Sequence, residues 1–199
     1  MKKIVVLLLS SSLLLIACNN DKPKDSITIT DKEGKEKITV SPSEIKNDME
    51  AMLQRKEELS AMTPLTADEL KALIPEELMG GVRTDLDINS AMGATVANAD
   101  YIIKDSIKLK LEVVDCAGPG GAGMFGMQYL NMFNVNSDDD DEYVKTIEVN
   151  GGKAFENCKK KRNRCTLVWF SGNRYLVSLR GDNTGIDALK DGAKGLDIK

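Results

Sequence analysis

The sequence predicts an α+β domain: an antiparallel sheet of about six strands, formed by a hairpin and a four-strand meander, with helices packed mainly on one face. Three observations predict this fold class. Apolar residues recur about every 3.6 residues before residue 75, as on helices. They recur at every second residue in most of the chain after residue 93, as on strands. Short turn signals separate the later strands, and strands joined by tight turns pair antiparallel.

The first 17 residues are typical of a signal peptide. Lys2 and Lys3 precede an apolar run that is shorter than the roughly 20 residues of a membrane-spanning helix. The run ends in Leu15-Ile16-Ala17-Cys18, which resembles the lipobox of bacterial lipoproteins. The resemblance implies that the leader is cut before Cys18 and that acyl chains such as palmitate on Cys18 anchor the protein in a membrane. We therefore expect a lipoprotein of the bacterial cell envelope, extracytoplasmic, on the periplasmic face or the cell surface. The alternative is an ordinary secretory signal with a chance cysteine at the cut.

Composition excludes several functional classes. The sequence has no histidine, so neither a histidine-based catalytic triad nor a histidine-ligated metal site can form. The formal net charge is −4, and it becomes −6 if Lys2 and Lys3 leave with the leader. A protein with a net negative charge lacks the positive field that attracts nucleic-acid phosphates. We therefore expect a non-enzymatic protein with no cofactor and no nucleic-acid partner.

Residues 18–40 are expected to be a lipidated tether with a small hairpin, and residues 41–74 to form two helices. Isoleucine alternates with threonine in "SITIT", and the alternation returns in "KITV". The first helix starts with Ser41 as N-cap and Pro42 at its first position, and it runs to about Ala61. A second capping pattern at Thr66 predicts a short helix that Pro75 ends. The apolar stripe of the first helix consists of Ile45, Met49, Met52, Leu59 and Met62.

Residues 75–199 are expected to form the α+β domain. Alternating runs at about 93–103 and 106–115 predict a half-buried hairpin, with Leu109 and Lys110 on opposite faces. A helix is expected over residues 122–133. The segments "EYVKTIEV", "KAFEN", "CTLVWFS" and "RYLVSLR" predict the meander, with a tight turn at Asn150-Gly151. Thr184 is expected to cap a last helix that begins near Ile186.

A glycine-rich segment separates the two sets of strands. Gly118, Gly120 and Gly123 match the dinucleotide-binding pattern G-x-G-x-x-G. Such a site needs a parallel β-α-β unit, whereas the segments on both sides are typical of antiparallel hairpins. We therefore expect a close-packed connection between a strand and a helix here.

Cys158 and Cys165 stand at facing ends of two predicted strands. In an oxidising compartment such a pair is expected to form a disulfide across the hairpin; the alternative is two free thiols. Cys116 ends an apolar strand, which favours a buried free thiol over a reactive one.

Two charged segments suggest a function for the surface of the protein. The loop between Cys158 and Cys165 could contact an anionic surface, such as lipid headgroups, and the alternative is a solvated hairpin tip. The acidic run 138–142 lacks the spacing of a calcium-binding EF-hand loop and is expected to be solvated. The candidate anionic-surface contacts are Lys159, Lys160, Lys161, Arg162 and Arg164.

Methionine occurs in two i, i+3 pairs, Met49 with Met52 and Met124 with Met127. Soft thioether ligands of this kind, with Cys116 nearby in sequence, could hold Cu(I). The favoured alternative is that these side chains fill gaps in the core.

Residues 65–197, which include "LIPEELMGGVRT" and "IDALKDGAKGLD", resemble a group of small bacterial proteins and lipoproteins with no established activity. The resemblance implies a shared fold and assigns no functional residue. We expect a lipid-anchored envelope protein that binds a partner protein or an envelope component. The alternative is a ligand-binding or copper-binding lipoprotein that uses the methionine-rich faces or a pocket beneath residues 118–127. A hydrolase built on Asp100, Asp105 or Asp115 has no supporting spacing.

Overall fold

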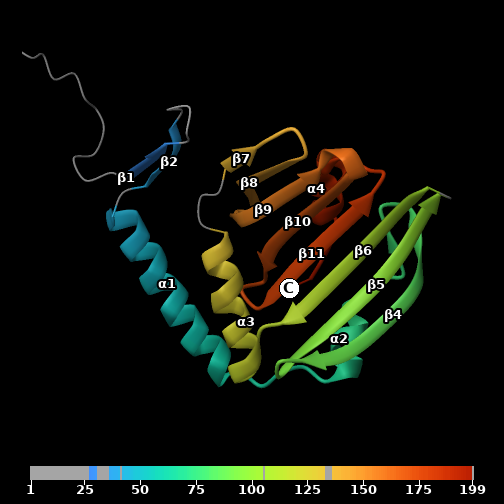
Figure 1. Ribbon diagram of the computed structural model, residues 1–199. Helices are drawn as coiled ribbons and strands as arrows, with labels where there is room; N and C mark the ends of the chain where they lie inside the picture. Colours follow the sequence, from blue (N-terminus) through green and yellow to red (C-terminus); the bar gives the residue numbers. More distant parts are fainter. Residues whose placement is uncertain (1–26, 31–35, 41, 105, 133–135, 199) are drawn as a thin grey trace, which may run out of the picture.

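The computed structural model describes residues 27–30, 36–40, 42–104, 106–132 and 136–198 (Figure 1). The expected signal peptide, the lipidation site Cys18, the N-cap Ser41 and the candidate carboxylate Asp105 lie outside these residues. No helix in the described part of the chain is both long enough and apolar enough to cross a membrane.

The centre of the fold is a nine-stranded antiparallel sheet. The strands lie in the order β3-β4-β5-β6-β11-β10-β9-β8-β7, and a separate hairpin pairs β1 with β2. An α+β fold with an antiparallel sheet is therefore confirmed, but the expected six strands omit β3, β4 and β7. The strands are β1 (Ile27–Thr30), β2 (Glu36–Val40), β3 (Glu77–Leu78), β4 (Gly81–Ala91), β5 (Ala94–Lys104), β6 (Ile107–Asp115), β7 (Asn136–Asp138), β8 (Glu142–Val149), β9 (Gly152–Lys159), β10 (Arg164–Ser171) and β11 (Tyr175–Asp182).

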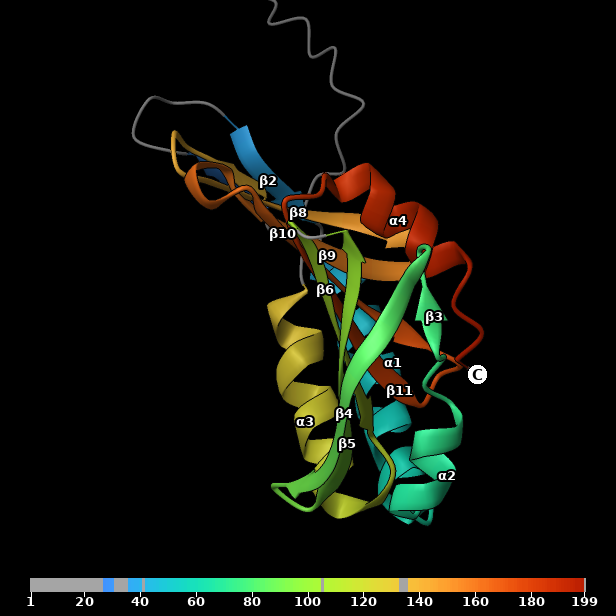
Figure 2. The ribbon, with the colours of Figure 1, turned by 90° about the vertical axis from the view of Figure 1, so that its right-hand side faces the viewer.

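Helices cover both faces of the sheet, so the predicted packing mainly on one face is only partly matched. On one face, α1 (Pro42–Ala61) and α3 (Gly118–Asn131) cover a cluster that includes Val114 and Leu176. On the other, α2 (Ala67–Ala72) and α4 (Ile186–Lys194) cover a cluster that includes Val113 and Val177. Figure 2 shows α3 and α4 on opposite sides of the sheet. On one strand, neighbouring apolar residues are buried on opposite faces of the sheet. This pattern indicates that both faces are covered.

The predicted alternation of β6 is confirmed. Leu109, Leu111 and Val113 are buried under α2 and α4, whereas Lys108 and Lys110 lie on the other face. Near Lys108 and Lys110, the face of the sheet opposite α2 and α4 carries polar residues that α1 and α3 do not cover.

The helix and turn signals are confirmed in most places. Thr66 caps α2 in a complete capping box with Glu69, and Asn150-Gly151 form the β8–β9 turn with φ of 53° and 77°. Thr184 does not cap α4, because the N-cap is Gly185 and no side chain bonds to the helix end.

Candidate ligand-binding site

A cavity of about 300 Å³ lies where α1 and α3 pass over the sheet. The alternative prediction was a pocket beneath residues 118–127. Of these residues only Phe125 lines the observed cavity. Mostly apolar side chains line it, with two cations among them. The lining residues are Ala51, Met52, Arg55, Phe125, Tyr129, Met132, Gly152, Lys153, Phe170 and Asn173.

Helical spacing brings the lining residues of each helix to one face. In α1, Met52 and Arg55 are three residues apart, and in α3 Phe125 and Tyr129 are four apart. Phe170 reaches the cavity from β10, on the sheet face opposite its buried neighbour Trp169.

Three aromatic rings form one wall. The Phe125 centroid lies 4.7 Å from that of Phe170 and 5.5 Å from that of Tyr129. The Tyr129 and Phe170 centroids are 6.1 Å apart, and all three pairs are tilted. Such tilted packing is favourable between aromatic rings and leaves apolar ring surface toward the cavity.

Charged groups stand at the rim. Lys153 forms an ion pair with Asp48 of α1, and the Arg55 Nη1 atom lies 2.6 Å from the Glu58 carboxylate. Burial and the negative charge of Asp48 raise the pKa of Tyr129, while Lys153 lowers it; the net direction is upward. The Tyr129 hydroxyl is therefore neutral at pH 7 and able to donate a hydrogen bond.

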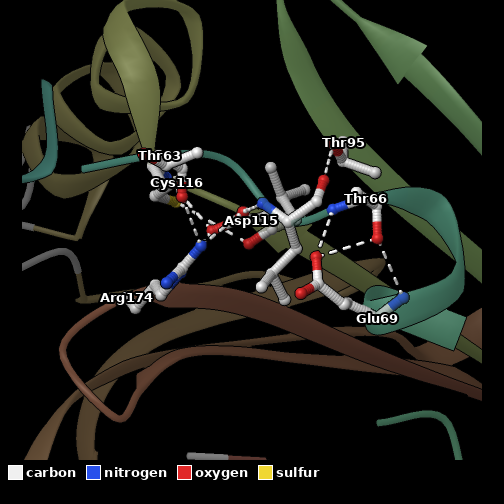
Figure 3. Close-up of polar contacts among 10 residues, drawn as sticks. Thr63, Thr66, Glu69, Thr95, Asp115, Cys116 and Arg174 are labelled. Atoms are coloured by element: carbon white, nitrogen blue, oxygen red, sulfur yellow. Dashed lines mark hydrogen bonds and ion pairs between the residues drawn. The ribbon is translucent and has the colours of Figure 1, made fainter. Parts of the chain in front are cut away.

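The buried carboxylate of Asp115 joins Arg174, the linker after α1 and the start of α3 (Figure 3). The carboxylate of Asp115, which is fully buried, accepts hydrogen bonds from Arg174 Nε at 2.7 Å and Arg174 Nη2 at 2.9 Å. It also accepts the backbone N–H of Leu65 at 2.6 Å and that of Ala117 at 3.2 Å. Arg174 Nη2 donates in addition to the Thr63 carbonyl. The linker after α1 is thereby held to the end of β6.

The same contacts show what Asp115 does. Burial raises the pKa of its carboxyl, but the Arg174 side chain and the N–H groups of Leu65 and Ala117 outweigh burial and lower it. Both oxygens are occupied by donors, so Asp115 is a structural carboxylate. Asp100 is exposed on β5 opposite Lys110, whereas Asp115 lies opposite Thr95, so the structure does not bring these two hydrolase candidates together.

Two of the three glycines of the motif, Gly118 and Gly120, serve close packing. A Cβ atom on Gly120 would lie 2.3 Å from the Met92 carbonyl oxygen, and one on Gly118 would lie 2.8 Å from Pro64. The strand before α3 belongs to an antiparallel sheet, whereas a dinucleotide site requires a parallel one. The expected close packing agrees with this geometry, but the glycines lie inside α3 (Gly118–Asn131), which begins four residues before the expected start at residue 122, and not in a connection before it.

Cys158 and Cys165 face each other in the β9–β10 register and lie at disulfide distance, with 2.06 Å between the sulfur atoms. Three basic residues between these cysteines form ion pairs. Lys160 Nζ lies 2.6 Å from Asp138, Lys161 pairs with Asp141, and Arg164 pairs with Asp182. The acidic and basic runs, which the sequence presents as separate, therefore lie together. The remaining candidates for anionic contact, Lys159 and Arg162, are exposed.

The methionines of the copper hypothesis are only partly gathered. Met52 and Cys116 are buried in one cluster, against which Met49 and Met124 pack, but the Met127 side chain is 55% exposed. Burial raises the pKa of the Cys116 thiol to about 12. Among the described residues, no group of three or more Cys, Asp or Glu side chains is placed to hold a metal ion.

Sequence reasoning missed the aromatic wall and its charged rim. The spacing of Phe125 and Tyr129 was one available signal, and the adjacent Trp169-Phe170 pair was another, because it implies two covered faces. Asp48 and Lys153 are separated by more than 100 residues, and no local pattern connects them.

Comparison with protein-family models, with curated proteins and with solved structures gave no match to this chain.

Proposed function

We propose that this chain is a lipid-anchored, non-enzymatic envelope protein that binds a small amphiphilic component of the envelope in the cavity between α1, α3 and the sheet. The observation that carries the proposal is an apolar cavity of about 300 Å³ with an aromatic wall and a charged rim. Ligand sites have this composition: many apolar and aromatic side chains and a few polar groups that orient the ligand.

The lining defines the chemistry of the ligand. An apolar body would contact Phe125, Phe170 and Met52, while a polar head would meet Lys153 and Arg55 at the rim. An anionic head would compete with Asp48 for Lys153, because both carry negative charge. The volume is at the lower end of the range for ligand pockets, so the ligand would be a small ring system or a short chain.

The anchor is supported by the sequence Leu15-Ile16-Ala17-Cys18. Cysteines at disulfide distance are typical of oxidising compartments outside the cytoplasm. Mass spectrometry of the mature protein tests this part of the proposal. It should show an N-terminal peptide that begins at acylated Cys18, and an unacylated cysteine or an intact leader would contradict it.

Fluorescence titration with two probes tests the ligand class. One probe is 8-anilinonaphthalene-1-sulfonate, an aromatic anion, and the other is 1-N-phenylnaphthylamine, its uncharged counterpart. Both should bind with a stoichiometry of one. Lys153→Met should weaken binding of the sulfonate by about three-fold, as expected for an exposed charge pair, and leave the uncharged probe unaffected.

Ala51→Phe is the blocking variant, because Ala51 is exposed on α1 and lines the cavity. Its new ring should fill the cavity and weaken both probes at least ten-fold. Ala61→Phe is the matched control, since Ala61 is exposed on the same helix and outside the lining. Equal binding to the Ala51→Phe and Ala61→Phe variants would place the probes elsewhere and contradict the proposal.

The copper alternative has weaker support. Three of the four paired methionines lie in or against one cluster with Cys116, but Met127 is directed to solvent.

A further inference from the structure

The outer edge of β4 is open. β5 pairs with β4 from Val82 to Ala91 with a register shift between Arg83 and Asp85, whereas β3 pairs with its other side only at Gly81 and Val82. Arg83 donates its N–H to the Glu76 carbonyl, and from Thr84 to Ala91 no described strand pairs with the outer side. Figures 1 and 2 show β4 at the margin of the sheet, and in Figure 2 it faces the viewer uncovered. Eight residues of backbone are thus available to a further strand.

The opposite margin differs. β7 is only three residues long. The Thr146 hydroxyl of β8 donates to the Met132 carbonyl, so the end of α3 contacts the strand beside β7. Short or contacted edges resist pairing with other chains, whereas a long open edge permits it.

The two faces of β4 carry different chemistry. Leu86 and Ile88 are half-buried and pack against the core under α2 and α4. Asp85 and Asp87 are exposed on the other face, and Asp85 lies directly opposite the exposed Asp100 of β5.

The carboxylates of Asp85, Asp87 and Asp100 have no cation within ion-pair distance among the described residues. Asp87 accepts a hydrogen bond from Asn89. The nearest cation in the register is Lys110, which lies opposite Asp100 on β6 and two strands from the edge.

We propose that the open edge of β4 binds an extended segment of another protein as an added strand, with lysine or arginine at alternate positions and apolar residues between them. The backbone supplies the hydrogen bonds, as in other cases of strand addition. Alternation places the cations of the segment beside Asp85 and Asp87 and its apolar side chains beside Leu86 and Ile88.

A second copy of this chain is the less suitable occupant. Pairing of two β4 edges would bring both copies of Asp85 and Asp87 to the same face of one ribbon, and like charges on neighbouring strands are destabilising. The charges that oppose self-association therefore favour a basic segment.

Fluorescence anisotropy of a labelled peptide tests the proposal with the full chain. The probe is the acetylated and amidated octapeptide TKVKVKVT. It should bind, and hydrogen exchange should slow at the alternate amides of residues 84–91 that point away from β5. The same peptide with glutamate in place of lysine should not bind. A version with N-methyl groups along one backbone edge should also fail, because that edge then lacks its donors.

Asp85→Asn combined with Asp87→Asn should weaken binding about five-fold, as expected for the loss of two exposed charge pairs. The control is Asp187→Asn with Asp191→Asn, which removes two exposed carboxylates from α4 and should leave binding unchanged. Equal binding to both double variants, protection outside β4, failure of the lysine peptide to bind, or a β4-dependent dimer in sedimentation velocity would each overturn the proposal.

Discussion

At the scale of single residues, Asp115 links pH to stability. Its folded pKa lies below the ordinary value because the donors of Arg174, Leu65 and Ala117 outweigh burial. A lowered carboxyl pKa adds stability that is fully present above the unfolded pKa of about 3.9 and is lost as the pH falls through the folded pKa. The contribution of Asp115 should therefore be constant near neutral pH, begin to fall at about pH 4 and be lost at lower pH, as the pH passes through the folded pKa.

Arg174→Met should lower the free energy of unfolding by about 3 kcal/mol at pH 7, because it leaves the buried carboxylate of Asp115 without its cation. Urea unfolding at pH 7 and pH 4 measures this. The loss should be smaller at pH 4, because without the Arg174 cation burial raises the pKa of Asp115 and the variant can take up a proton there. Adding Asp115→Asn should recover part of the loss at pH 7. An equal loss at both pH values would contradict the assigned role of the pair.

Thiol accessibility tests the cysteine assignments. In the native protein Cys116 should not react with a thiol reagent, because its side chain is buried and its pKa is raised to about 12. Denaturation without reductant should expose Cys116 alone among the three cysteines of the domain. Labelling of Cys158 or Cys165 under these conditions, read by peptide mass spectrometry, would show that the disulfide is absent.

At the scale of elements, the start of α3 depends on glycine for contact rather than for ligand binding. A Cβ atom on Gly121 would lie 2.5 Å from the carbonyl carbon of Cys116, whereas one on Gly123 would meet nothing within 4 Å. The two positions belong to the same helix and differ only in what lies beside them.

Gly121→Ala should therefore lower the free energy of unfolding by about 2 kcal/mol, because backbone atoms must move to admit the methyl group. Gly123→Ala should raise it by about 0.5–1 kcal/mol through helix propensity. Thermal unfolding of the two variants compares them directly. A stabilised Gly121→Ala variant would show that α3 packs less closely than described.

The sequence predicted most elements where local signals were strong. Capping residues marked α1 and α2, and alternation with Asn150-Gly151 marked β8 and β9. It failed at β4, because Asp85, Asp87 and Asn89 disfavour strands in isolation. The alternation of Leu86 and Ile88 before the Met92-Gly93 turn was the signal that remained. Pairing with β5 overrides the weak propensity of this segment.

At the scale of the whole molecule, the cavity is a consequence of covering both faces of one sheet. With helices on one face only, α1 and α3 would compete with α2 and α4 for the same surface. Because α2 and α4 cover the opposite face, α1 and α3 alone cover the face that carries Phe170, and both helices line the cavity with Phe170. The sequence did not predict this meeting, since the cavity combines four elements whose contacts are long-range.

Methyl NMR of methionine tests the central claim, that this cavity binds an amphiphile. Met52 and Met132 line the cavity, whereas Met92 and Met127 are exposed elsewhere, so the ε-methyl signals of the last two serve as internal references. Addition of 8-anilinonaphthalene-1-sulfonate should shift the Met52 and Met132 signals to saturation at one equivalent and leave those of Met92 and Met127 in place. Unchanged Met52 and Met132 signals, or shifts of similar size at all four, would contradict the account.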